Sequence, residues 1–337
     1  MSTMRKTADE AGQRFRFVEI KPGGHEQTLC AAVADGLAKK QKSLPTRFLY
    51  DKTGSELFEE ITRLPEYYLT RSEHSILQAH SREMIEAVGD SLSIIEFGSG
   101  SSQKTRLLLE AALNQQHGLT YTPIDISSEF LRQTARTLLE DYPTLSVSAI
   151  AGEYFDVAAA LPDHDGPRLV LFLGSNIGNL THDEAVDFMG RVSRRFGADD
   201  RALVGIDLVK DPRVIEPAYN DAQGVTAKFN QNILHRINRE LGANFDVSCF
   251  RHRAPFDPIQ SRVEMRLYST QAQEAHVEAI DSTFSFAEGE YIHTEWSHKY
   301  TRQSFGQLCR KAGLEIEHAW LDESQWFTMM MLRKVRS

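Results

Sequence analysis

One stretch of the chain decides the fold: residues 94–106, with the sequence IIEFGSGSSQKTR. Its apolar start predicts a strand, which stops at Gly98 and Gly100 and is followed by a helix beginning near Lys104. Glycines between a strand and the N-terminus of a helix let a ligand approach the backbone. The stretch lacks the third glycine of a dinucleotide fingerprint and the Gly-Lys-Ser/Thr of a phosphate loop, so it completes neither motif.

An acidic residue further along restricts the ligand. The next predicted strand, residues 119–126, carries Asp125 near its end. In α/β folds, a carboxylate about 20 residues beyond the glycine turn accepts hydrogen bonds from ribose hydroxyls. The turn and Asp125 together predict a ligand that contains adenosine.

Strands and helices then alternate along the chain. Strands are predicted at residues 147–151, 168–173 and 202–208, and helices at 129–140 and 182–196. Strand 168–173 is almost continuously apolar, which is typical of a central parallel strand covered on both faces. The alternation predicts a doubly wound, mostly parallel α/β sheet that binds ligands at the carboxyl ends of its strands.

The alternation breaks after Leu208. Two helical patterns in residues 211–246 precede segments with one polar face, which predict separate strands at residues 263–269, 276–280, 281–286 and 292–300. A helix at residues 302–312 and a closing antiparallel hairpin at 314–320 and 327–333 follow. We therefore expect a second, smaller α+β domain.

Composition limits the possible functions. The 337 residues carry a net charge of −9, which argues against binding the phosphates of nucleic acid. No apolar run is long enough to predict a membrane span. The cysteines Cys30, Cys249 and Cys309 are odd in number and far apart, which favours reduced thiols over a disulfide framework or a zinc site. We expect a cytoplasmic monomer that uses no metal.

Short motifs spread along the chain resemble those of one enzyme family. They are Arg47–Asp51, Gly54–Phe58, Ile61–Tyr68, Glu96–Gly100, Leu173–Leu180, Asp207–Asp211, Phe229–Asn232 and Thr294–Ser297. From about Leu44 to its C-terminus, the chain resembles the L-histidine Nα-methyltransferases of ergothioneine biosynthesis. The resemblance implies three successive methyl transfers from S-adenosylmethionine to the α-amino nitrogen of L-histidine, giving hercynine.

The resemblance also implies a division into domains. Residues 72–209 and 300–337 would form a class I, Rossmann-like methyltransferase domain that binds S-adenosylmethionine. Residues 15–71 and 210–299 would form a discontinuous substrate-binding domain, in agreement with the break after Leu208. Residues 1–14 are rich in small and charged side chains, and we expect them to be disordered.

Three residues match family positions that contact the cofactor, and two more stand at such positions with different residue types. Gly98 lets the backbone approach the ligand, Lys104 offers a cation to the methionine carboxylate, and Asp125 accepts both ribose hydroxyls. Glu153 and Tyr154 stand where the family usually has Asp-Phe beside adenine, so we expect the adenine contact from this pair.

Further residues match family positions that contact histidine. Tyr67, Asn179 and Tyr219 would hold its α-carboxylate. Neutral donors suit that anion, because a full cation would crowd the ammonium that develops beside it. Glu295 and Ser297 would read the imidazole: two residues apart on an extended segment, they point to the same side and can bond the two ring nitrogens separately.

The remaining matches are expected near the amine and the imidazole of histidine. Tyr50 and Phe58 match aromatic residues near the amine, where their faces can surround a methylammonium, and Tyr50 or a water beside it can accept the proton. Met265 matches a residue of the imidazole pocket, although its pattern also suits a core methionine. Gly174 is matched to the substrate as well.

Three residues depart from the family pattern beside these positions. They are Asn176, Trp296 and His298. Affinity or the preferred methylation state can therefore differ from the family. A catalytic base at His298 is conceivable, but a surface histidine is the interpretation that we favour.

Two alternatives remain open. One is an N-methyltransferase for another aromatic amino acid, such as a tryptophan derivative. Glu295 argues against it, because a carboxylate suits imidazole better than the carbon atoms of indole. The other is a non-catalytic module that binds S-adenosylmethionine, which would not need the polar residues matched to a second ligand.

Overall fold

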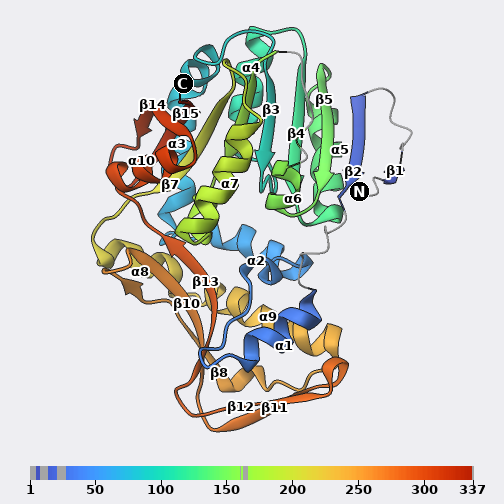
Figure 1. Ribbon diagram of the computed structural model, residues 1–337, viewed down its shortest axis with the longest axis vertical. Helices are drawn as coiled ribbons and strands as arrows, with labels where there is room; N and C mark the ends of the chain where they lie inside the picture. The colour runs from blue at the N-terminus through green and yellow to red at the C-terminus, as the bar shows by residue number, and fades with distance from the viewer. Residues whose placement is uncertain (1–4, 8–13, 21–27, 160, 162–165, 336–337) are drawn as a thin grey trace. The chain divides into compact units, whose positions relative to one another are not determined.

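Figure 1 shows a computed structural model of the chain, which describes residues 5–7, 14–20, 28–159, 161 and 166–335. The chain divides into two compact units. Unit 1 comprises residues 1–24, 69–209 and 300–337, and unit 2 comprises residues 25–68 and 210–299. Residues 15–20 and 69–71, which we expected in the first segment of the substrate domain, belong to unit 1.

Unit 1 is built around one large sheet. Among the described residues its strand order is β1-β2-β5-β4-β3-β6-β7-β15-β14. Strands β2 to β7 run parallel, whereas β15 is antiparallel to both of its neighbours. The strands are β1 (Arg5–Thr7), β2 (Phe15–Glu19), β3 (Ser93–Phe97), β4 (Leu119–Asp125), β5 (Leu145–Ala151), β6 (Arg168–Phe172), β7 (Arg201–Asp207), β14 (Leu314–Leu321) and β15 (Phe327–Lys334). The predicted mostly parallel sheet with a closing antiparallel hairpin is confirmed.

Helices pack on the sheet of unit 1. Their bounds are α3 (Tyr68–Glu86), α4 (Arg106–Gln115), α5 (Ser128–Asp141), α6 (Tyr154–Ala159), α7 (His182–Arg194) and α10 (Arg302–Lys311). The helices α6, α7 and α10 share a buried apolar core with the strands, and α7 lies in front of the sheet in Figure 1. The helices α4 and α5 pack against β4 and β5. Ser127 stands at the N-cap of α5, but its side chain makes no capping hydrogen bond.

The N-terminal strands extend this sheet. Strand β2 pairs in parallel with β5 and places Phe17 opposite Ala149. Phe17 is buried, and the guanidinium carbon of Arg132 lies 3.4 Å from its ring centroid. Strand β1 pairs antiparallel with β2, so the predicted disorder is wrong for residues 5–7. Apart from Arg14, the rest of the segment that we expected to be disordered lies outside the described residues.

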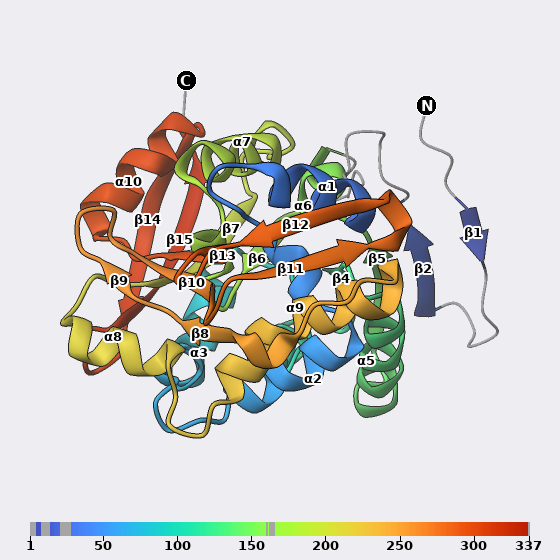
Figure 2. The same cartoon turned by 90° about the horizontal axis from the view of Figure 1, so that it is seen from below.

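Unit 2 combines helices with small antiparallel sheets. Strands β13, β10 and β8 lie side by side in that order, β9 pairs with β10, and β11 pairs with β12 (Figure 2). The elements are α1 (Leu29–Ala38), η2 (Thr46–Leu49), α2 (Lys52–Ile61), α8 (Pro212–Tyr219), α9 (Val225–Leu241), η4 (Val247–Cys249), β8 (Phe250–Arg253), β9 (Phe256–Asp257), β10 (Arg262–Ser269), β11 (Gln273–Val277), η5 (Glu278–Ile280), β12 (Ser282–Phe286) and β13 (Tyr291–His298). The strand predicted at 276–280 thus ends at Val277 and passes into the turn η5.

Among the described residues, every helix is too short or too polar to cross a membrane.

Candidate active site

The glycine turn after β3 has a backbone that only glycine adopts without strain. Gly98 has φ of +72°, and its N–H donates to the carbonyl oxygen of Ile124 at 2.8 Å. A Cβ at Gly98 would lie 2.4 Å from Oη of Tyr154 and 2.8 Å from Nδ2 of Asn176. Tyr154 and Asn176 occupy the space where a side chain would lie, so the position requires glycine.

Asp125 is tied to this turn by hydrogen bonds. Its Oδ2 accepts from the N–H of Gly100 and its Oδ1 accepts from the N–H of Ser127, both at 3.0 Å. Burial raises the pKa of Asp125. Each carboxylate oxygen has two lone pairs, so Asp125 retains capacity for the two hydroxyls of a ribose.

Glu96, the acid that precedes the glycine turn, belongs to a buried hydrogen-bond network. Glu96 accepts from Oγ1 of Thr105 at 2.8 Å and from the hydroxyl of Tyr121, and burial raises its pKa to about 7. Ser102 bonds the same tyrosine hydroxyl at 2.9 Å. This buried network joins β3, β4 and the start of α4, so it fixes the loop that carries the glycines.

Lys104 is held by a buried acid that sequence reasoning missed. Its ammonium donates to Glu73, a fully buried residue of α3 that also accepts from the N–H of Gly174 at 2.7 Å. A Cβ at Gly205 would lie 2.1 Å from Oε1 of Glu73. The glycine inside strand β7 was a signal of such close approach. The cation expected to meet a ligand is therefore paired with a carboxylate inside the protein.

The loops after β5 and β6 bring further predicted residues to the same edge of the sheet. Tyr154 packs edge-on against Phe97 and Phe172, with ring centroids 6.0 and 5.4 Å apart, and burial raises the pKa of its hydroxyl. Glu153 directly precedes it. Gly174, with φ of +71°, opens the loop that ends in the 3₁₀ turn η3 (Asn176–Asn179).

In unit 2, predicted aromatic residues form one continuous cluster. The members are Tyr50, Phe58, Tyr67, Tyr219 and Phe229. Tyr50 lies 5.6 Å from Phe58 and 5.3 Å from Phe229 between ring centroids, and Tyr67 lies 6.3 Å from both Phe58 and Tyr219. Phe229 lies within one of the matched motifs, but no role was predicted for it. Edge-to-face packing of this kind fixes ring orientations.

Strands β10 and β13 present the predicted imidazole residues on one face. Met265 pairs with Glu295 and Val263 pairs with Ser297, with a register shift after Met265. The hydroxyl of Tyr219 lies 2.8 Å from Oγ of Ser297. Two residues predicted for different groups of the substrate therefore share a hydrogen bond.

A buried cation accompanies this pair. The ammonium of Lys299 donates to the hydroxyl of Tyr219 at 2.7 Å and to Ser297 at 2.9 Å, and Lys299 is only 2% exposed. The expected set of neutral donors did not include this cation beside Tyr219. No local pattern predicts this buried lysine, because Lys299 follows a strand with a polar face, where lysine is normally solvated.

Glu295 is buried with unused hydrogen-bonding capacity. Glu295 is 6% exposed, and its Oε2 has no hydrogen-bond partner among the described residues. Burial raises the pKa of Glu295 to about 8, although the charge of Lys299 acts in the opposite direction. A buried polar atom without a partner is costly, so it indicates a place where a ligand group completes the bonding.

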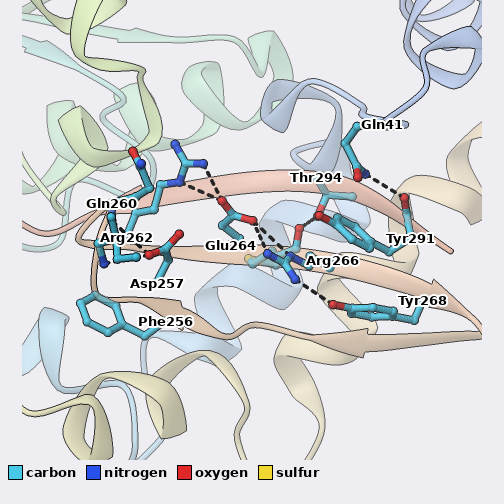
Figure 3. Close-up of polar contacts among 12 residues, drawn as sticks. Gln41, Phe256, Asp257, Gln260, Arg262, Glu264, Arg266, Tyr268, Tyr291 and Thr294 are labelled. Atoms are coloured by element: carbon cyan, nitrogen blue, oxygen red, sulfur yellow. Dashed lines mark hydrogen bonds and ion pairs between the residues drawn. The ribbon is translucent and has the colours of Figure 1, made fainter. Parts of the chain in front are cut away.

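Two departures from the family pattern occupy unexpected positions. His298 is 3% exposed, so the expected surface histidine is wrong. Trp296 lies on the face of β13 opposite Glu295, where it stacks on His293 with centroids 4.6 Å apart. That face carries its own ion-pair ladder, in which Glu264 accepts from Arg262 and Arg266 at 2.6 Å each (Figure 3).

Among the residues that the structure describes, no cluster of three or more His, Cys, Asp or Glu side chains could hold a metal ion.

The topology and the edge residues of unit 1 define a class of protein. The order β5-β4-β3-β6-β7-β15-β14, with β15 antiparallel, is that of class I S-adenosylmethionine-dependent methyltransferases. A family model described as "Histidine-specific methyltransferase, SAM-dependent" matches residues 29–334. The chain therefore belongs to this family.

Curated relatives agree with the family. The chain is 40% identical over 299 residues to the histidine N-alpha-methyltransferase of Mycolicibacterium smegmatis, covering 89% of this chain and 92% of that protein. It is also 40% identical over 302 residues to the histidine N-alpha-methyltransferase of Mycobacterium tuberculosis, covering 90% and 94%. Ergothioneine biosynthesis protein 1 of Neurospora crassa is 32% identical over 296 residues, covering 83% of this chain and 32% of that protein.

Replacing Gly98 by alanine tests whether this position of the turn requires glycine. We expect Gly98→Ala to weaken S-adenosylhomocysteine binding at least about 10-fold and to cost about 1 to 2 kcal/mol of stability, because a Cβ is strained at positive φ and would displace Tyr154. Calorimetric titration and urea unfolding measure the two effects. Gly100→Ala is a matched control, since Gly100 also has positive φ but has open space at its Cβ position. Equal losses of affinity in both variants would contradict the close approach at Gly98.

Proposed function

We propose that this protein transfers three methyl groups from S-adenosylmethionine to the α-amino nitrogen of L-histidine, giving hercynine, the first step of ergothioneine biosynthesis. Membership of the histidine-specific family supports the reaction. One observation in the structure carries the choice of substrate: the buried carboxylate of Glu295 has an oxygen without a partner in the described part of the chain, and it shares a strand face with Ser297. A carboxylate and a hydroxyl are the groups that imidazole nitrogens require.

Unit 1 supplies the residues that would hold S-adenosylmethionine. The positive φ and missing Cβ of Gly98 fit a ligand that touches the backbone, and Asp125 has capacity for ribose hydroxyls. Tyr154, beside the turn, is the proposed adenine contact, together with Glu153. When bound, S-adenosylmethionine supplies an electrophilic methyl group on its sulfonium. Glu73 fixes Lys104 at the end of the sheet, where its ammonium is proposed to meet the methionine carboxylate.

The histidine α-carboxylate and imidazole are assigned to separate residues. Tyr67 and Tyr219 from unit 2, and Asn179 and Gly174 from the loop after β6, are proposed to hold the carboxylate and backbone of histidine. Glu295, Ser297 and Met265 are proposed to line the imidazole site. These contacts orient the amine, and orientation of two reactants supplies most of the rate in a direct displacement.

The aromatic cluster of unit 2 suits the product as well as the substrate. Tyr50 and Phe58 can surround a nitrogen that becomes a trimethylammonium, with about 0.5 to 2 kcal/mol from cation–π attraction. Tyr50, or a water beside it, is proposed to accept the proton that the amine must lose before each transfer.

The decisive experiment is an incubation of the full chain with L-histidine and S-adenosylmethionine. We expect mono-, di- and trimethylhistidine to be resolved by mass, with the trimethyl product accumulating at long times. L-Tryptophan offered in the same assay tests the alternative substrate class. Faster consumption of tryptophan than of histidine, or no consumption of histidine, would show the substrate assignment to be wrong.

A further inference from the structure

Asn230 lies at the centre of a buried hydrogen-bond network in unit 2. It belongs to the Phe229–Asn232 motif, for which no role was predicted, and its side chain on α9 is fully buried. Its Oδ1 lies 2.6 Å from Oγ1 of Thr294. Its Nδ2 lies 2.9 Å from Nδ1 of His252 and 3.3 Å from the carbonyl oxygen of Arg266. One side chain therefore contacts the three strands β8, β10 and β13.

The carbonyl oxygen of Arg266 fixes the direction of these hydrogen bonds. A carbonyl oxygen only accepts, so the NH2 group of the Asn230 amide faces it and also donates to Nδ1 of His252. The hydrogen of the neutral imidazole therefore lies on Nε2, which donates to the carbonyl oxygen of Tyr219 at 2.8 Å. Burial lowers the pKa of His252, which keeps the ring neutral. A chain of hydrogen bonds thus runs from Asn230 to the backbone of Tyr219.

The oxygen of the Asn230 amide holds an irregular point in β13. The pairing of β13 with β10 shifts between Met265 and Arg266, and Thr294 is the extra residue that the register skips. The amide oxygen carries no hydrogen, so the hydroxyl of Thr294 donates to it. Thr294 and Glu295 are both buried, although consecutive residues of a regular strand point to opposite faces. Because a bulge re-aims the side chains beside it, the hydrogen bond at Thr294 helps to decide where Glu295 points.

We propose that Asn230 is a positioning residue that fixes Glu295 and Tyr219 relative to each other. This inference rests on the proposed function and deepens it, because Glu295 is assigned to the imidazole of histidine and Tyr219 to its α-carboxylate. The two residues lie on different elements, β13 and the end of α8, so local backbone geometry does not set their separation. Asn230 acts through Thr294 and His252 and not by contact with the substrate.

Replacing Thr294 tests the branch toward Glu295. Valine keeps the shape of threonine without the hydroxyl, so we expect Thr294→Val to raise the KM for histidine at least about 10-fold with kcat changed by less than about 3-fold. Thr294→Ser keeps the hydroxyl and should stay within about 3-fold of the wild-type KM. In a Glu295→Gln background, Thr294→Val should raise the KM by less than about 3-fold, since coupled residues are not additive. Calorimetry should show unchanged binding of S-adenosylhomocysteine in the Thr294 variants.

Replacing His252 tests the branch toward Tyr219. Leucine fills much of the same space without polar atoms, so His252→Leu should raise the KM for histidine at least about 10-fold with kcat changed by less than about 3-fold. Glutamine has an N–H donor for the carbonyl of Tyr219 and an oxygen that can accept from Asn230. His252→Gln should therefore recover part of the KM.

The outcomes separate positioning from a purely structural role. An unchanged KM in both Thr294→Val and His252→Leu, or equal losses in Thr294→Ser and Thr294→Val, would overturn the proposal. So would the same fold-change with and without Glu295→Gln, or failure of both Thr294→Val and His252→Leu to fold. If the wild-type protein does not methylate histidine, the proposed function fails instead, which the first assay shows before any variant is made.

Discussion

Glu295→Gln is expected to make the folded protein more stable at high pH while raising the KM for histidine about 10- to 100-fold. Glu295 is 6% exposed, and one of its oxygens lacks a partner among the described residues. Ionising such a group inside the protein is costly. Glutamine keeps the shape and the carbonyl oxygen but cannot ionise, so it removes this cost along with the charge proposed to hold an imidazole N–H.

The sign of the pH dependence follows from the raised pKa. Burial raises the pKa of Glu295 in the folded state to about 8 from an ordinary value of 4.5. Below the ordinary value both folded and unfolded chains keep the proton, and the variant has no advantage. Between the two values only the folded chain keeps it, so wild-type stability falls as pH rises, and above about pH 8 the loss is constant. The full difference is about 3 to 5 kcal/mol.

Urea unfolding at about pH 5 and about pH 9 measures this difference for the wild type and Glu295→Gln. Glu264→Gln is a matched control on the opposite face of the neighbouring strand. Hydrogen bonds and charges from Arg266 and Arg262 hold the pKa of Glu264 low despite burial, so its replacement should destabilise the protein at the higher pH. A gap between wild type and Glu295→Gln that does not widen with pH would contradict the assignment of a buried, uncompensated acid.

Most of the fold could be predicted because its elements are encoded locally. The almost continuously apolar residues of β6 identify a buried parallel strand, and the glycines after β3 identify a strand-to-helix turn. Each feature is recognised from a few neighbouring residues. Strand β2 shows the limit of this reasoning. Its alternation predicts a strand, but pairing with β5 joins residues far apart in the sequence, and no local pattern chooses the partner.

Residues of the candidate site that lie in motifs could be predicted from the sequence, whereas its buried charged partners could not. Matched motifs located the glycine turn, Asp125 and the residues of β13, because these positions carry recognisable residue types. Glu73 and Lys299 were missed because each is an ordinary charged residue in a helix or after a strand with a polar face. What makes them unusual is burial, which depends on the second element packed over them and not on their neighbours in the chain.

Lys104→Met is expected to cost about 2 to 4 kcal/mol of stability, beyond any effect on the cofactor. The fully buried Glu73 would lose the ammonium that neutralises it and keep the N–H of Gly174, a neutral donor. Breaking a buried pair by removing one partner is costlier than removing both, because the remaining charge is left in a poor solvent. Urea unfolding of Lys104→Met at neutral pH measures the loss.

The double variant Glu73→Gln with Lys104→Met separates the two roles of the lysine. Glutamine can still accept from Gly174, and no buried charge remains, so most of the stability should return. Affinity for S-adenosylhomocysteine should not return, because the proposed cation for the methionine carboxylate is absent from both variants. If Lys104→Met were as stable as the wild type, Glu73 would not depend on this cation. If the double variant bound S-adenosylhomocysteine as tightly as the wild type, Lys104 would act only as the counter-ion of Glu73, and the carboxylate would be held by the backbone of the glycine turn.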